Sequence, residues 1–115
     1  MAYFIIAHFL EKVTIPSSVT SIAGNAFYGW RSLKQIIIPQ SVKSFGNNAF
    51  RGCFSMTKIK ISSSVTSIGE GAFNQCQLLT EITIPSSLTL IENETFQACY
   101  SLKKVSFENP SSLKS

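Results

Sequence analysis

The residues of this sequence best suited to chemistry are three cysteines spaced 23 residues apart, Cys53, Cys76 and Cys99. Thiolates can bind zinc or act as nucleophiles, and two thiols can form a disulfide. A zinc site would need CxxC-like spacing or several histidines, and the chain contains only His8. If the cysteines lie in neighbouring strands about 4.8 Å apart, their parallel Cβ directions disfavour a disulfide. Buried thiols acting as small hydrophobes are therefore our first interpretation, with a disulfide and a metal site as alternatives.

The other titratable residues do not form a catalytic set. No aspartate is present, so a Ser-His-Asp arrangement is impossible, and a Cys-His pair would require His8 to meet a cysteine from a distant turn. A pair of carboxylates for acid-base chemistry would need a cleft. The six glutamates fall mostly in columns expected to face solvent: Glu11, Glu70, Glu81, Glu92, Glu94 and Glu108. The sequence therefore predicts no enzyme, no cofactor and no metal site.

Composition indicates one domain of a packed protein. The chain has 115 residues, of which 44% are hydrophobic and 14% charged, with a net charge of +4. The cations are scattered, which argues against a nucleic-acid-binding stripe. No apolar run approaches the length of a membrane span, and Met1 to Leu10 lack the basic start and cleavage pattern of a signal peptide. We expect neither nucleic-acid binding nor membrane insertion.

The cysteine spacing belongs to a repeat that covers the whole chain. Besides the cysteines, six apolar columns keep the same phase: Leu10, Leu33, Met56, Leu79 and Leu102; Val13, Ile36, Ile59, Ile82 and Val105; Ile15, Ile38, Ile61, Ile84 and Phe107; Val19, Val42, Val65 and Leu88; Ile22, Phe45, Ile68 and Ile91; Phe27, Phe50, Phe73 and Phe96. Such periodicity predicts a solenoid whose turns shelter one another from water.

Each unit, approximately LKxIxIPxSVxSIGxxAFxGCxS, has a local interpretation. The LxxIxI segment predicts a short strand, which ends at Pro16, Pro39 and Pro85 and at Ser62 in the third unit. The SxxSIG segment predicts a turn-rich return, and AFxxC predicts a short helical turn that points its Phe inward. At the column of Ala23, Gly46, Gly69 and Glu92, the non-glycine residues indicate that a positive φ is not required and that the glycines serve close packing.

These assignments predict an α/β repeat solenoid of the leucine-rich-repeat type. Short parallel strands would form the concave face, with tight turns and short helical turns on the convex side. We predict a single domain over residues 1–115, with a partial repeat at 1–9, full repeats at 10–32, 33–55, 56–78 and 79–101, and a partial repeat at 102–115. Neither end resembles a polar cap, so we expect a piece or a shortened relative of a longer array, able to associate end to end.

The pattern resembles the BspA-like, or Treponema pallidum-type, leucine-rich repeats. The resemblance is carried by IPSSVTSIAGNAF (15–27), IPQSVKSFGNNAFRGC (38–53) and SSVTSIGEGAFNQC (63–76). It implies a non-catalytic recognition or adhesion module within a cell-surface or secreted protein, with a host or matrix protein as partner. An intracellular protein-interaction scaffold is the alternative, so a cytoplasmic location stays open.

The candidate binding surface is the outward side of the predicted strands, at the third and fifth positions of LxxIxI. Repeat proteins commonly bind partners on such a surface. A weaker candidate is the pair of aromatics after the cysteine column, Phe54 and Tyr100. The residues predicted to contact a partner on the concave face are Lys12, Thr14, Gln35, Ile37, Lys58, Lys60, Glu81, Thr83, Lys104 and Ser106.

Overall fold

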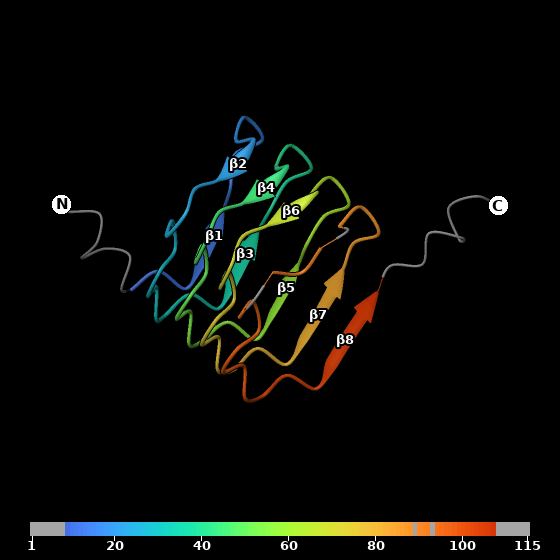
Figure 1. The fold of residues 1–115 in the computed structure, drawn as a ribbon. Helices are drawn as coiled ribbons and strands as arrows, with labels where there is room; N and C mark the ends of the chain where they lie inside the picture. The colour runs from blue at the N-terminus through green and yellow to red at the C-terminus, as the bar shows by residue number, and fades with distance from the viewer. Residues whose placement is uncertain (1–8, 89, 93, 108–115) are drawn as a thin grey trace.

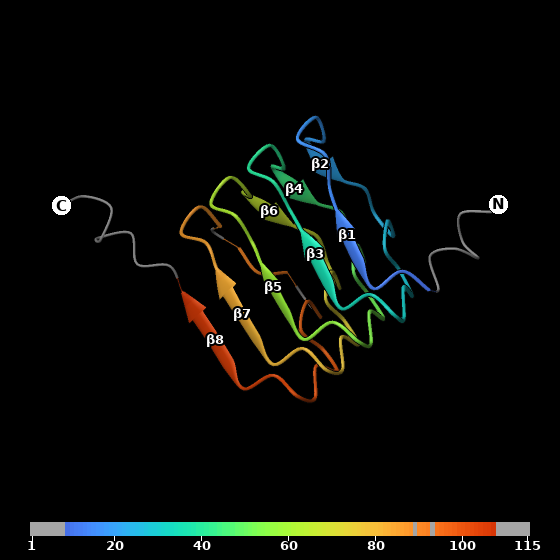
Figure 2. The same ribbon diagram turned by 180° about the vertical axis from the view of Figure 1, so that it is seen from behind.

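The fold is a coil of short parallel strands. The computed structural model describes residues 9–88, 90–92 and 94–107. One side of the coil, here called the strand side, carries β1 (Lys12–Thr14), β3 (Gln35–Ile37), β5 (Lys58–Lys60), β7 (Glu81–Ile84) and β8 (Lys104–Phe107). A second side carries β2 (Ser21–Ile22), β4 (Ser44–Phe45) and β6 (Ser67–Ile68), as Figures 1 and 2 show from opposite directions.

Every strand pairing follows the 23-residue period predicted from the sequence. Val13 lies opposite Ile36, and Ile82 lies opposite both Ile59 and Val105, with all pairs parallel. Alternation explains the orientation of the strands, because the central Ile of β3 and β5 is buried while the residues on either side of it are exposed. The prediction of parallel strands stacked in a solenoid is confirmed.

The return segment contains strands that the sequence analysis did not predict. In β2, β4 and β6 a Ser is followed by a buried apolar residue, and the three segments form one parallel sheet in the order β2-β4-β6. Each lies just after a turn closed by a backbone bond such as Val42 N–H to Pro39 O, 3.2 Å. Ile91, the equivalent residue of the fourth turn, is 42% exposed and lies outside any strand.

A column of stacked phenylalanines fills the core. The ring centroids of Phe27, Phe50, Phe73 and Phe96 are separated successively by 5.4, 5.5 and 5.8 Å, with planes within 7° of parallel. Phe50 and Phe73 are fully buried, and Phe45 packs edge-on against both. The prediction that these side chains point inward and align from turn to turn is confirmed.

The predicted helical turns are wrong, because the described part of the chain contains no helix. Trp30 N–H does bond to Phe27 O at 3.2 Å, but Phe27 N–H donates to Ala49 O of the next turn at 2.8 Å. Asn25 and Gly29 adopt positive φ values of 62° and 73°, which a right-handed helix does not allow. The segment is therefore a chain of tight turns bonded to its neighbour. No helix able to cross a membrane is found in residues 9–88, 90–92 and 94–107.

The glycine interpretation is confirmed at Gly46. Its φ is not positive, but a Cβ at this position would lie 2.7 Å from Gly24 Cα, closer than real Cβ atoms approach backbone. Gly69 is in the same situation, with a Cβ 2.6 Å from the Gly46 carbonyl carbon. The two glycines allow successive turns to approach one another at this corner of the coil.

Candidate functional site

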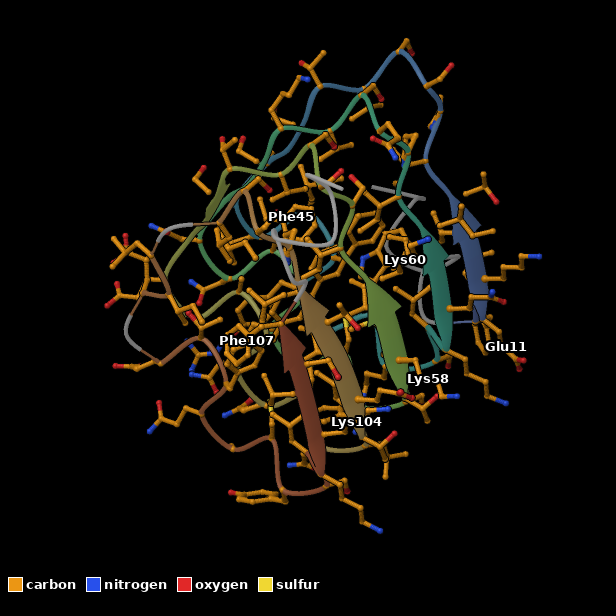
Figure 3. All side chains as sticks on the ribbon, turned by 90° about the vertical axis from the view of Figure 1, so that its right-hand side faces the viewer. Glu11, Phe45, Lys58, Lys60, Lys104 and Phe107 are labelled. Carbon is orange, nitrogen blue, oxygen red and sulfur yellow. The ribbon has the colours of Figure 1, made fainter. Side chains whose placement is uncertain are left out.

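The predicted partner-binding residues all lie on the strand side. Their two columns alternate with the buried column of Val13, Ile36, Ile59 and Ile82, so their side chains point away from the core. Glu81 and Ser106 are half-buried, and the others are exposed. Figure 3 shows Lys58, Lys60 and Lys104 along this side, and Phe45 within the coil. Their proposed contact with a partner stays a prediction.

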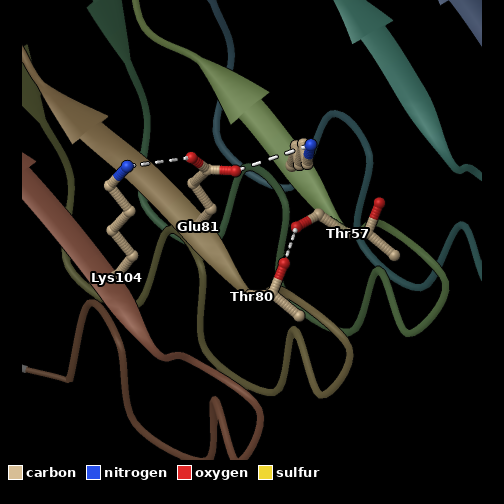
Figure 4. A network of polar contacts seen from close by, with 5 residues as sticks. Thr57, Thr80, Glu81 and Lys104 are labelled. Atoms are coloured by element: carbon tan, nitrogen blue, oxygen red, sulfur yellow. Dashed lines mark hydrogen bonds and ion pairs between the residues drawn. The ribbon is translucent and has the colours of Figure 1, made fainter.

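Positive charge dominates the strand side. Six lysines and two glutamates lie in the strands or immediately before them, an excess of four positive charges: Lys12, Lys34, Lys58, Lys60, Lys103 and Lys104, with Glu11 and Glu81. Glu81 forms ion pairs with two of these lysines, with Nζ–O distances of 3.6 Å to Lys58 and 3.7 Å to Lys104 (Figure 4). Such exposed ion pairs add little stability, so the lysines remain available to a ligand.

One position breaks the regularity of the strand side. The β1-β3 and β5-β7-β8 pairs are hydrogen-bonded, but β3 and β5, which lie side by side, belong to separate sheets. A pocket of about 700 Å³ lies between them, lined by residues 34–40, residues 57–60 and Ser62. We call it the β3–β5 groove. The ladder of parallel strands on the strand side is therefore interrupted at this point.

The groove brings together four of the ten predicted residues, Gln35, Ile37, Lys58 and Lys60. The six others lie elsewhere on the strand side: Lys12, Thr14, Glu81, Thr83, Lys104 and Ser106. Sequence analysis missed the rest of the lining, notably Lys34, Gln40, Thr57 and Ser62. Ser62 carried a signal, since it replaces the proline that follows the strand in the other full repeats. Its Oγ lies 2.6 Å from that of Ser64.

The cysteine column is structural. Each thiol donates a hydrogen bond to a phenylalanine carbonyl of the preceding turn, as Cys53 Sγ does to Phe27 O at 3.2 Å and Cys76 Sγ does to Phe50 O at 3.1 Å. Burial raises the pKa of the Cys53 thiol to about 12, and a backbone hydrogen bond at Trp30 opposes the shift less strongly. Burial also raises the pKa of Cys76 and of the half-buried Cys99. All three thiols are free, so the buried-thiol interpretation is confirmed at Cys53 and Cys76.

The remaining titratable residues are dispersed. Within the described ranges, no group of three His, Cys, Asp or Glu residues is placed to hold a metal ion. Glu11, Glu70, Glu92 and Glu94 are exposed, as expected. His8 and Glu108, together with residues 1–7 and 109–115 of the predicted end repeats, lie outside the described residues.

The aromatic candidates on the opposite side differ from each other. Phe54 is half-buried, with the Arg31 guanidinium 5.6 Å from its ring centroid. Tyr100 is 79% exposed. The expectation of two exposed aromatics is therefore wrong for Phe54, whose ring is covered by the cation from the preceding turn.

An apolar surface lies at the C-terminal end of the described coil. Leu90 and Phe107 are 61% and 68% exposed, and together with Leu88 and Ile91 they line a shallow hollow of about 370 Å³. The residues equivalent to Ile91 and Phe107 in the preceding turn, Ile68 and Ile84, are buried. The exposed apolar side chains therefore form a patch at this end of the described coil.

Comparison with known proteins identifies the repeat. The profile of the BspA type Leucine rich repeat region matches residues 2–115 in six copies. A leucine-rich repeat protein from Bacteroides capillosus is 33% identical, with a TM-score of 0.79 over 87% of this chain and 78% of that one. No curated protein matches the sequence.

Two further solved structures are similar. A leucine-rich repeat protein from Eubacterium ventriosum is 28% identical, with a TM-score of 0.69 over 84% of this chain. The T. pallidum leucine-rich repeat protein is 25% identical, with a TM-score of 0.65 over 84% of this chain. The present chain spans 32% and 56% of their lengths, so these relatives extend well beyond the coil described above.

Proposed function

Because the chain belongs to the BspA-type leucine-rich repeat family, we propose that it is a non-catalytic recognition module that binds a protein partner through its strand side. Leucine-rich repeats typically serve as protein-interaction modules, and BspA-type proteins are often secreted or found at the cell surface. Adhesion to a host or matrix protein, as part of a longer surface or secreted protein, is the specific role proposed.

The proposal rests on the strand side because its outward residues vary from turn to turn on a regular scaffold. The central strand column keeps Ile or Val in every turn, whereas the outward columns hold Lys, Gln, Glu, Thr, Ile and Ser. Variable side chains on a rigid, regular scaffold form a surface whose specificity can change without cost to the fold. The β3–β5 groove adds a concave feature to this surface.

The proposal is tested with immobilised extracellular-matrix proteins and surface plasmon resonance. The double variant Lys58→Glu/Lys60→Glu is expected to lose at least tenfold in affinity for a bound matrix protein. The matched control is Lys43→Glu/Arg31→Glu, which reverses two charges outside the strand side. Equal binding by wild type and the Lys58/Lys60 variant would remove the strand side from consideration.

The alternative, an intracellular interaction scaffold, is favoured by one observation, the three free thiols. Free cysteines are common in reducing compartments. Brief protease treatment of intact cells distinguishes the two locations, because a surface protein is cleaved while a cytoplasmic one is protected.

We also propose that the apolar C-terminal face permits end-to-end association. Leu90, Ile91 and Phe107 are exposed there, and the outer edge of β8 has no partner strand among the described residues. Such an edge favours pairing with another copy. Light scattering coupled to size-exclusion chromatography should show mass rising with concentration, and Phe107→Lys should reduce the rise. A monomer at millimolar concentration would contradict the proposal.

A further inference from the structure

The β3–β5 groove is an opening in the hydrogen-bonded ladder of the strand side. The same two turns are joined on the second side by β4 and β6 and on the opposite side by the bond from Phe50 N–H to Ala72 O, 2.8 Å. On the strand side, β3 bonds to β1 and β5 bonds to β7, but β3 and β5 are not hydrogen-bonded neighbours. Neither strand contains a proline, so each retains its backbone donors and acceptors.

The lining of the groove combines apolar and cationic groups. Ile36 and Ile59, each 5% exposed, belong to the core and form an apolar floor. Ile37 is 42% exposed at the rim. Lys34, Lys58 and Lys60 also line the groove. A ligand that fits must offer negative charge and an apolar group within a short distance of each other.

Lys60 is the strongest candidate to bind an anion. Lys34 pairs with Glu11 at 3.5 Å and Lys58 pairs with Glu81 at 3.6 Å, so both are partly neutralised. Among the described residues, no carboxylate pairs with Lys60. Its neighbours in the same outward column are Ile37 and Thr83, both uncharged. An incoming carboxylate therefore meets no competing anion at this lysine.

We propose that the β3–β5 groove binds an extended acidic peptide segment of the partner that carries an apolar side chain between its carboxylates. The carboxylates contact Lys60 and Lys58, and the apolar side chain packs on Ile37. A nucleic acid or sulfated glycan would satisfy the charges but not the apolar strip. The inference rests on the proposed function and specifies the partner chemistry at the same surface.

The test uses a fluorescein-labelled synthetic peptide of alternating glutamate and leucine, ten residues long, with fluorescence anisotropy at two salt concentrations. Lys60→Gln is expected to weaken binding about tenfold, as for loss of a charge-assisted contact. Ile37→Thr is expected to weaken it about fivefold, while leaving the fold intact because Thr14 and Thr83 occupy the same column. Lys43→Gln removes the same charge beside β4, on the second side of the coil, and should change affinity less than twofold.

Three results would overturn the inference: no peptide binding at millimolar concentration, equal losses for Lys60→Gln and Lys43→Gln, or equal affinity for a ten-residue glutamate peptide or a single-stranded DNA. Circular dichroism melts of each variant separate lost binding from lost folding. The proposed function is judged independently by the matrix-protein measurement. A strand side that binds a matrix protein but no acidic peptide would reject this inference alone.

Discussion

The strand side and the side opposite it are built from the same repeat but have different roles. On the side opposite the strands, here called the turn side (residues 25–30, 48–53, 71–76 and 94–99), backbone bonds link successive turns without interruption, as from Gly29 to Arg51 and from Gln75 to Gln97, both 2.8 Å. The cysteine thiols and the stacked phenylalanines reinforce these links. On the strand side the ladder stops between β3 and β5.

This difference shows that cohesion and recognition are separated around the circumference of the coil. On the turn side the phenylalanine column recurs in every turn, and Phe27, Phe50, Phe73, Cys53 and Cys76 are buried, so these residues and the backbone bonds beside them hold the turns together. The strand side is exposed, charged and variable, and it tolerates an open ladder because the other two sides keep the turns aligned. We therefore expect substitutions on the turn side to change stability, and those on the strand side to change binding.

Hydrogen exchange gives the largest expected contrast. The Phe50 amide, bonded to Ala72 O at 2.8 Å, should exchange on the order of a thousandfold more slowly than the Lys58 amide, which has no backbone partner. Amide-resolved exchange by NMR measures both, and the Gln35 amide, bonded to Glu11 O at 3.1 Å, is the strand-side control. Equal protection of Lys58 and Gln35 would mean that the ladder is closed in solution.

Removing a central ring should be the most costly substitution. Phe73 is fully buried between Phe50 and Phe96, so Phe73→Ala should lower the free energy of unfolding by about 3–5 kcal/mol. The half-buried Phe96 serves as the end-of-stack control and should cost less when replaced by Ala. Urea denaturation measures both, and equal losses would contradict a stack that is tightest at its centre.

Adding a side chain at the corner where the glycines of successive turns meet should lower the free energy of unfolding by less than Phe73→Ala does. Gly46→Ala places a Cβ 2.7 Å from Gly24 Cα and should destabilise by about 1–3 kcal/mol, as overpacking does. In Gly24→Ala, the nearest atom is Asn47 O at 3.3 Å, so the change should be under about 1 kcal/mol. Thermal melts compare the pair, and a neutral Gly46→Ala would show that the turns can move apart at this corner.

The buried thiols make stability depend on alkaline pH. The Cys53 pKa is about 12 in the folded chain against 9.0 for a free thiol. Between these values the unfolded chain loses a proton that the folded chain keeps, so the free energy of unfolding falls by up to about 1.4 kcal/mol per pH unit. Cys53→Ser should reduce this slope between pH 9 and 11 in denaturation curves. Parallel pH profiles for wild type and variant would reject a buried, protonated thiol.

The smallest expected effect is an increase in the free energy of unfolding. Ala98 adopts a φ of 59°, where the equivalent Gly29 and Gly52 have 73° and 76°. Because left-handed backbone strains an L-residue, Ala98→Gly should stabilise the chain by about 0.5–1 kcal/mol. Ala72→Gly is the opposite control, since Ala72 is fully buried without a positive φ and should lose stability. A lower melting temperature for Ala98→Gly would contradict the strain.

The sequence predicted those features that the hydrophobic columns determine. Period, parallel register, inward phenylalanines, buried cysteines and the tight glycine corner all follow from residue types that recur every 23 positions. The helical turn failed because local propensity was applied to AFxxC without noticing the left-handed positions before and within it. Asn25, Asn48 and Gly71 could have revealed one of them, but Gln75, Glu94 and Ala98 conceal the pattern in later turns.

The groove was beyond sequence analysis for a different reason. The residues of β3 and β5 match the strand columns as well as those of β1 or β7 do, so nothing in the columns predicts the missing ladder. Sequence analysis assigned the outward residues to the correct side of the coil, but it did not identify which of them line the β3–β5 groove. Lys34 escaped notice because it precedes its strand, although it reaches the groove.

Contacts between turns join residues about one 23-residue period apart, and this has a consequence for how the number of repeats can change in evolution. The carbonyl that accepts each inter-turn bond lies at most 26 residues from its donor, and each ring of the phenylalanine column stacks only on those one period away. Excising one period, such as residues 33–55, would bring Phe27 against Phe73 with the phase preserved. Duplication or loss of whole units by unequal crossing-over would therefore lengthen or shorten the coil while reshuffling the motifs it displays.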